Sequence, residues 1–194
     1  YVEVSPPQES IQGTQWWTSY QPVNYKLDSK LGTEAEFKNM VQQCSAAGVG
    51  IIADVVLNQT TGADVAAGDQ KGVAGSEYNG STGSYPGFAT KQYPDGITAA
   101  DFHSCTKNIS DYTNQKEVQE CRLSSMWDFN SESEKVQDIQ SDYLASLWNA
   151  GVRGFRMDAV KHIHTDSMKA IKEKFAKKIG KNANDIYWIQ EVIG

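Results

Sequence analysis

The chain has 194 residues, of which 39% are hydrophobic and 22% charged, a composition typical of a globular protein with one sizeable core. Its net charge of -6 argues against nucleic-acid binding, and its longest apolar runs are far too short to span a bilayer. We therefore expect soluble small molecules, neutral polymers or cations as partners, and neither nucleic acid nor membrane.

The first fifty residues predict a strand, an irregular aromatic segment and a helix. The chain starts directly with the strand pattern "YVEVSP", without an initiator Met or a signal pattern, so we expect it to be part of a longer protein. Thr33 and Glu36 fit a capping box, apolar residues then recur at helical spacing, and Gly48 ends the pattern.

A buried strand and a long insertion come next. The segment "VGIIADVVLN" is almost continuously apolar, as in parallel strands that are covered on both faces. From about Gln59 to Phe129 the chain is rich in Gly, Ser, Thr, Asp and Tyr, and it has no helical period until its end. A segment of this length inside a domain is commonly functional or a small subdomain.

Regular elements return near Ser131. Ser131 and Glu134 fit a second capping box, an apolar stripe follows from Val136 to Trp148, and Gly151 ends this helix. The strand "VRGFRMD", a helix from about Asp166 and the strand "IYWIQEV" complete the chain.

Alternating strands and helices are typical of parallel β/α units. A doubly wound sheet also has this order, but no glycine-rich phosphate loop follows any of the strands. We therefore predict an α/β fold that is part of a (β/α)8 TIM barrel. Residues 1–58 and 130–194 would form the barrel segments, and residues 59–129 the insertion.

Two carboxyl groups stand at predicted carboxyl strand ends, where barrel enzymes place their chemistry. Arg156 and Asp158 share one side of their strand, so the guanidinium should lower the pKa of Asp158 and keep it ionised. The apolar neighbours of Glu191 should raise the pKa of that carboxyl. This pairing suits retaining glycoside hydrolysis, whereas the alternative is a salt bridge beside an exposed glutamate. Spacing alone favours neither interpretation.

The three cysteines allow two interpretations. Cys105 and Cys121 flank a polar loop that a disulfide could close, while Cys44 lies on the apolar face of a helix. The alternative is three reduced thiols in the core.

Six segments resemble the α-amylase family of retaining α-glucan hydrolases, most closely its animal-type branch. They are "SPP", "WWTSYQPVNYKL", "ADVVLNQ", "CRLSSMWDFN", "GFRMDAVKH" and "QEVIG", in the order and approximate spacing of that family. The resemblance implies barrel strands two to five, with the B domain of the family as the insertion after strand three. It implies endo-acting hydrolysis of α-1,4-glucosidic bonds in starch or glycogen by double displacement, in a secreted, extracellular protein that is a monomer at full length.

The resemblance also assigns the catalytic roles. Asp158 would be the nucleophile, Arg156 would orient it, and Glu191 would be the general acid/base. The third acidic residue of the family would follow Gly194, so we expect the chain alone to be inactive. The alternative is a non-catalytic, amylase-like glucan-binding protein. Its one hint is Gln59, which replaces a histidine of the family and cannot become cationic.

By the same resemblance, several residues would contact the sugar. Trp17, Tyr20 and Gln21 match the donor-side loop of the family, whereas we expect the neighbouring Trp16 to be a core residue at the barrel rim. Gln59, Lys161 and His162 would also line the substrate site. A solvated side chain is the alternative for Lys161.

Calcium is the expected cofactor, because hard cations bind oxygen ligands. By resemblance the ligands would be the Asn58 side chain, the Arg122 carbonyl, the Asp128 carboxylate and the His162 carbonyl. Without the family, Asn58 would be interpreted as a turn residue and Asp128 as a carboxylate preceding a helix. Zinc is not expected, because no second His or Cys stands at zinc spacing from His162. The resemblance to the animal-type branch also makes chloride a candidate cofactor. Activation by chloride in that branch depends partly on residues later in the family's chain, so Arg156 alone leaves this question open.

Overall fold

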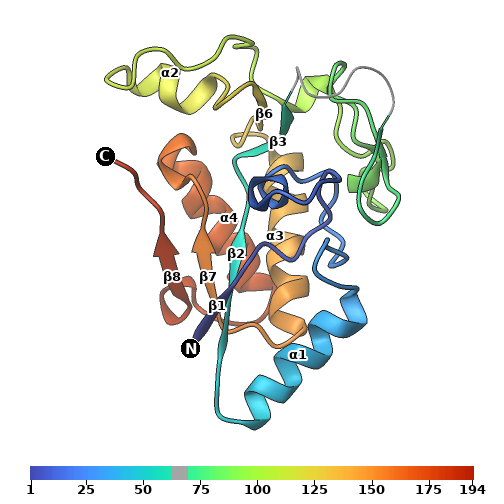
Figure 1. The fold of residues 1–194 in the computed structure, drawn as a ribbon. Helices are drawn as coiled ribbons and strands as arrows, with labels where there is room; N and C mark the ends of the chain where they lie inside the picture. The colour runs from blue at the N-terminus through green and yellow to red at the C-terminus, as the bar shows by residue number, and fades with distance from the viewer. Residues whose placement is uncertain (63–69) are drawn as a thin grey trace.

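Four parallel strands form the central sheet of the computed structural model, which describes residues 1–62 and 70–194. The sheet order is β1-β2-β7-β8, and each strand pairs in parallel with its neighbour. Figure 1 shows the insertion beyond the arrowheads of the strands, at their carboxyl ends. The bounds are Val2–Val4 (β1), Ile51–Val55 (β2), Gly154–Met157 (β7) and Tyr187–Gln190 (β8).

Three long helices alternate with these strands, as the sequence predicts. They are α1 (Glu34–Ala46), α3 (Glu134–Asn149) and α4 (Thr165–Lys178), and in Figure 1 α3 and α4 lie behind the sheet. The predicted capping box at the start of α1 is present, since Thr33 accepts from the Glu36 backbone and Glu36 from the Thr33 backbone. The alternating parallel order confirms the predicted α/β class.

The predicted second capping box is wrong. Helix α3 has Ser133 as its N-cap residue, and no side chain caps it. Ser131 lies before the cap, its hydroxyl is 3.3 Å from a Glu132 oxygen, and its carbonyl accepts from the Gln137 side chain. The motif failed because it placed the helix start two residues too early.

The apolar stripe of α3 is buried as predicted. Val136, Ile139, Tyr143, Leu144 and Leu147 are all at most 5% exposed. The last three pack with the sheet and with α4 in one hydrophobic cluster. The five residues of β2 are also buried, as expected for a strand that is covered on both faces.

The insertion contains short elements around an aromatic cluster. Tyr78, Tyr85, Phe88, Phe102 and Phe129 are buried together, which gives this segment a core of its own. Its elements are β3 (Gln59–Gly62), β4 (Gln70–Lys71), β5 (Glu77–Tyr78), α2 (Gln115–Glu120) and β6 (Met126–Asp128). Short 3-10 helices span Trp16–Tyr20, Pro86–Phe88, Ala99–Asp101, Val160–His162 and Ala183–Asp185. Within the described ranges, no helix is long and apolar enough to cross a membrane.

The cysteines follow the first of the two interpretations. Cys105 and Cys121 form a disulfide, whereas Cys44 is free and packs, half-buried, against the main core. The bond ties the segment before α2 to the end of that helix.

Replacing both Cys105 and Cys121 with Ser should lower the free energy of unfolding by about 3 kcal/mol, because the bond closes a loop of roughly fifteen residues in the unfolded chain. Urea unfolding under oxidising conditions measures this difference. Cys44→Ala is the matched control and should cost less than about 1 kcal/mol. Equal stability of the parent and the double variant would contradict the prediction.

Candidate active site

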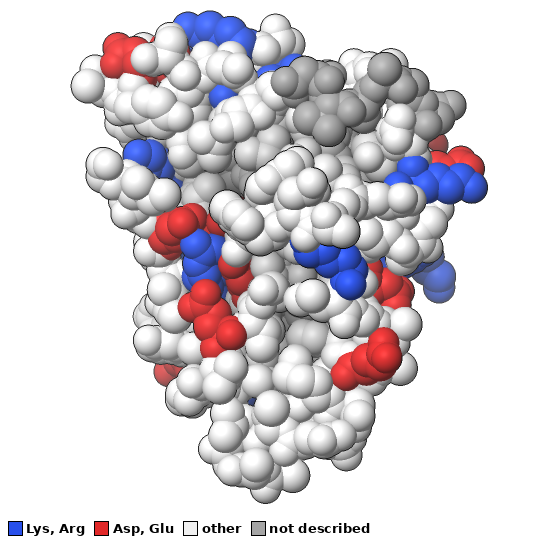
Figure 2. Space-filling view, in the orientation of Figure 1, with Lys and Arg blue, Asp and Glu red and all other residues white. Residues whose placement is uncertain are grey.

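One arginine joins carboxyl groups from four strands at the carboxyl end of the sheet. Nη1 of Arg156 donates to Asp54 Oδ2 at 2.8 Å and to Asp158 Oδ1 at 3.1 Å. Its Nη2 lies 2.7 Å from Glu191 Oε1, and its Nε lies 3.8 Å from Glu3 Oε1. Figure 2 shows a patch on this face of the molecule where basic and acidic side chains meet.

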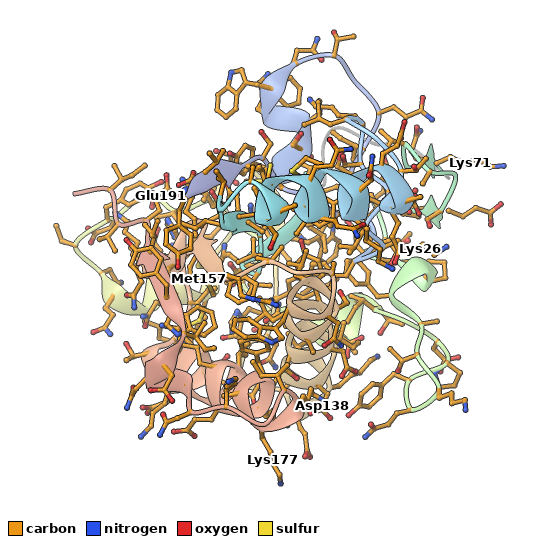
Figure 3. All side chains as sticks on the ribbon, turned by 90° about the horizontal axis from the view of Figure 1, so that it is seen from below. Lys26, Lys71, Asp138, Met157, Lys177 and Glu191 are labelled. Atoms are coloured by element: carbon orange, nitrogen blue, oxygen red, sulfur yellow. A yellow bond between two sulfur atoms is a disulfide. The ribbon has the colours of Figure 1, made fainter. Side chains whose placement is uncertain are left out.

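The register of the parallel strands brings these groups together. Asp54 on β2 pairs with Arg156 on β7, so both side chains point to the same side of the sheet. The Asp158 backbone donates to Val55, and the Glu191 backbone donates to Met157 at 3.1 Å, so both residues continue the ladder beyond the strand ends. Figure 3 labels Met157 and Glu191 in this region.

The structure contradicts the predicted pKa of Asp158. The pKa of Asp158 is raised to about 7, mainly by burial and then by the nearby Asp54 charge, and Arg156 opposes both effects. The guanidinium does contact Asp158, but it is shared among several carboxylates and does not offset the burial of a residue that is only 8% exposed.

The predicted apolar surroundings of Glu191 are also wrong. Its Oε1 pairs with Arg156, and its Oε2 accepts from the Ala159 backbone at 2.9 Å. The apolar side chains of Val192 and Ile193 are instead 62% and 68% exposed. The apolar neighbours of Glu191 in the sequence do not surround its carboxyl group in space.

Asp54 is a further member of the site that the sequence patterns do not predict. This residue is 2% exposed, pairs with Arg156, and accepts a 2.8 Å hydrogen bond from the Tyr20 hydroxyl. Its Oδ1 has no hydrogen-bond partner among the described residues. The available signal was a lone carboxylate inside the otherwise apolar run "VGIIADVVLN".

A strained turn follows Asp158. Ala159 has a φ of 47°, in the left-handed region that non-glycine residues rarely adopt. The turn directs the Ala159 backbone N–H to Glu191 and leads into the 3-10 helix Val160–His162. Strain of this kind concentrates at functional sites, because the surrounding structure must hold it in place.

A cavity of about 760 Å³ opens at this end of the sheet. All the residues that sequence analysis assigned to catalysis or sugar binding line it, although they come from distant parts of the chain. They are Trp17, Tyr20, Gln21, Gln59, Arg156, Asp158, Lys161, His162 and Glu191.

The aromatic loop differs from expectation at one position. Trp16 is 75% exposed and lines the cavity, so its predicted place in the core is wrong. Its ring meets the Tyr20 ring edge-on, with 5.8 Å between the centroids. Trp17 is also exposed, whereas Gln21 is buried and its side-chain oxygen accepts from the Gly62 backbone. Exposed indoles at a cavity mouth are suited to stacking on a ring-shaped ligand.

Polar residues from two other segments complete the cavity wall. The Gln59 amide donates to the Tyr20 carbonyl at 3.1 Å and lies 3.5 Å from Asp158 Oδ2, so this residue reaches the predicted nucleophile. The Lys161 ammonium donates to the Ile193 carbonyl at 2.6 Å. His162 is buried, with Nδ1 donating to the Val118 carbonyl at 2.9 Å.

Asn58 and Asp128 lie together at the junction of the insertion with the sheet. The Asn58 carbonyl accepts a hydrogen bond from the Phe129 backbone N–H. The Asn58 side chain lies close enough to Asp128 to oppose the rise in the pKa of that carboxyl. Neither Asn58 Nδ2 nor Asp128 Oδ1 has a well-formed hydrogen bond within the described residues. Burial raises the pKa of Asp128 to about 6. A buried carboxylate with an unused oxygen beside an amide fits a hard cation such as calcium.

The other two predicted calcium ligands are backbone carbonyls. The Arg122 carbonyl accepts from the Ile109 backbone at 2.9 Å, and a carbonyl oxygen retains a second lone pair for a cation. Arg122 and His162 are both at most 9% exposed. The donor chemistry of the four residues therefore fits calcium.

The chain matches the catalytic-domain model of the alpha-amylase family over residues 4–190. It is 38% identical to an alpha-amylase of Streptomyces violaceus over its whole length, and 38% identical to one of Pecten maximus over 88% of its length. The chain spans 30% and 33% of those two relatives.

A solved structure, wild-type alpha-amylase I from Eisenia fetida, superposes on 98% of the chain with a TM-score of 0.86 and 35% identity, and the chain covers 39% of it. This similarity supports the TIM-barrel class that the sequence predicts. With 187 consecutive residues inside the family model, the chain belongs to the alpha-amylase family.

Proposed function

We propose that the protein containing this chain hydrolyses internal α-1,4-glucosidic bonds of starch or glycogen with retention. The observation that carries the proposal is the joining of Asp158 and Glu191 by Arg156 in the wall of one aromatic-rimmed cavity. Retaining glycosidases use two carboxyl groups, one as nucleophile and one as acid/base. The Eisenia fetida relative is also known as a variant complex with maltohexaose, which supports an α-glucan substrate.

In this proposal Asp158 attacks the anomeric carbon and Glu191 protonates the departing oxygen. Arg156 orients both carboxyl groups, since it contacts each within 3.1 Å. Asp54 accepts from the same Arg156 nitrogen as Asp158 and thereby helps to hold the guanidinium in place. Glu191 then takes a proton from the water that releases the sugar. Trp17, Tyr20, Gln21, Gln59, Lys161 and His162 would bind the glucan around the scissile bond.

The proposed division places strands two to five of the barrel in residues 1–58 and 130–194, with a B-domain-like insertion at 59–129. Calcium would bind Asn58, Arg122, Asp128 and His162, and would join the insertion to the barrel. Its charge would offset the burial of Asp128. Chloride stays a prediction from the resemblance alone, because the Arg156 nitrogens already face carboxylates.

The proposal also places the protein outside the cell as a monomer. The Cys105–Cys121 disulfide supports secretion, because such bonds persist in oxidising compartments.

Replacing the two carboxyl residues in the full-length protein should separate their roles. Asp158→Asn should abolish turnover of starch and of an activated aryl maltoside, because no glycosyl-enzyme can form. Glu191→Gln should slow starch hydrolysis by about 10³-fold but spare the aryl substrate, whose leaving group needs no protonation. Steady-state rates on both substrates measure the difference.

Glu3→Gln is the control, because Glu3 also lies near Arg156 but is 48% exposed at its side chain. It should leave both rates within about twofold. Near-normal starch turnover by Asp158→Asn would show that Asp158 is not the nucleophile and that its pair with Arg156 is a structural salt bridge. Binding of maltohexaose by a full-length parent protein that never hydrolyses starch would instead support the glucan-binding alternative.

The stability of the protein should fall as pH rises through the raised pKa of Asp158. Its ordinary pKa is about 3.9, so the folded state holds a proton that the unfolded state releases between that pH and about 7. The contribution of Asp158 to the free energy of unfolding is therefore fully present below pH ~4 and is lost as the pH rises through ~7. As the pH rises from 5 to 8, the free energy of unfolding of Asp158→Asn should therefore increase by about 2 kcal/mol relative to that of the parent. Urea unfolding of both proteins at pH 5 and pH 8, at fixed calcium, measures this gain. A stability difference between variant and parent that is the same at both pH values would refute the prediction.

Asp128→Asn should weaken calcium binding at least about tenfold, because it removes the charged ligand. Calorimetric titration with calcium checks this expectation. Asp142→Asn is the control, since its carboxylate is 56% exposed on α3. An unchanged calcium affinity in Asp128→Asn would remove this residue from the proposed ligand set.

A further inference from the structure

Two histidines and a glutamate from three distant segments meet beside the insertion. His103 follows the 3-10 helix Ala99–Asp101, Glu132 precedes α3, and His164 is the N-cap residue of α4. One potential ligand atom from each lies within 4.8 Å of the others. Glu132 Oε2 is 3.0 Å from His103 Nε2, and Glu132 Oε1 is 3.1 Å from His164 Nε2. Both oxygens of one carboxylate thus face imidazole nitrogens.

A network of ion pairs explains only part of this arrangement. His103 has a hydrogen bond at each ring nitrogen. His164 Nε2, in contrast, is buried without a well-formed hydrogen bond among the described residues, although Glu132 is close. A buried polar atom without a partner is costly, and native structures commonly supply an ion or a water at such a position. This nitrogen lies 3.1 Å from Glu132 Oε1 and 3.8 Å from Glu120 Oε1.

Asp128 orients the first histidine. Its Oδ2 accepts from His103 Nδ1 at 2.6 Å, and its backbone carbonyl accepts from the His103 backbone at 3.0 Å. In a neutral imidazole whose proton is held at Nδ1, Nε2 would offer a metal its lone pair in place of the hydrogen bond that it makes to Glu132 here. Metal-binding histidines have this same carboxylate partner on the nitrogen away from the metal.

We propose that His103, Glu132 and His164 bind a zinc ion. Two imidazoles and one carboxylate form a ligand set that zinc accepts, whereas calcium prefers oxygen ligands alone. Ligand atoms of tetrahedral zinc lie about 3.3 Å apart, given metal–ligand distances near 2 Å, and each histidine Nε2 lies 3.0 or 3.1 Å from a different oxygen of Glu132. Glu120 of α2, whose Oε1 is 3.8 Å from His164 Nε2, or a water takes the fourth position.

This site lies apart from the proposed chemistry and serves the assembly of the fold. None of its three ligands lines the sugar-binding cavity. It joins the insertion to the starts of two barrel helices, and Asp128 links it to the proposed calcium site through its other carboxylate oxygen. No zinc-binding motif is visible in the sequence at these positions, because the ligands are separated by twenty-nine and thirty-two residues along the chain.

Titration of the full-length, calcium-saturated protein with zinc tests the proposal. Isothermal calorimetry and metal analysis after dialysis should show that Glu132→Gln and His164→Gln each bind one zinc ion fewer than the parent, or bind it at least tenfold more weakly. Cobalt added in place of zinc should give the intense visible bands of a tetrahedral site in the parent and lose them in both variants. The thermal midpoint of the parent should rise with zinc, and that rise should be smaller in the variants.

Glu134→Gln is the matched control, because Glu134 lies two residues from Glu132 but its side chain is 84% exposed. It should bind zinc like the parent. Far-UV circular dichroism and calcium affinity show whether each variant is folded, and the partly exposed Glu132 gives a variant that should fold even where His164→Gln does not. Absence of saturable zinc binding in the parent, or equal zinc binding by folded Glu132→Gln and the parent, would overturn the proposal.

Discussion

The Arg156 guanidinium is the interaction on which the candidate active site depends. It is the common partner of carboxyl groups from four consecutive strands of the sheet, and two of them, Asp54 and Asp158, are buried. Several carboxylates in so small a volume would repel one another without a cation between them. A planar guanidinium donates in several directions at once, which the point charge of a lysine cannot reproduce. The arrangement of the site therefore follows from one side chain on β7.

Asp128 has a similar position where the insertion meets the barrel. One of its oxygens orients His103, and the other, near Asn58, has no well-formed hydrogen bond among the described residues. In our proposals this carboxylate contacts calcium directly and supports zinc indirectly. Two cations on either side of one buried carboxylate would fix the insertion over the cavity, in addition to the apolar cluster that the insertion shares with α3. Loss of either ion would then change the geometry of the other site.

Periodic patterns predicted most of the fold, because they depend on local geometry. The stripe of α3, the capping box of α1 and the buried strand β2 follow from spacing along the chain. The second capping box failed where several cap residues stand close together. The site was harder to predict, since its electrostatics depend on contacts across the sheet. Asp54 and the histidine cluster come from segments that only the folded chain brings together, and burial, which no motif reports, determines the direction of the Asp158 pKa shift.

The aromatic cluster of the insertion has a consequence for how the chain unfolds. Val136 and Ile139 of α3 belong to that cluster, as do Ile11 and Val23 from the segment between β1 and α1. The insertion therefore cannot open without exposing the first turns of a barrel helix and part of the aromatic loop. Cooperativity in such units is set by shared buried surface rather than by position in the sequence. Amide protons at the start of α3 should thus exchange together with those of the insertion, as one foldon that crosses the boundary between the two regions.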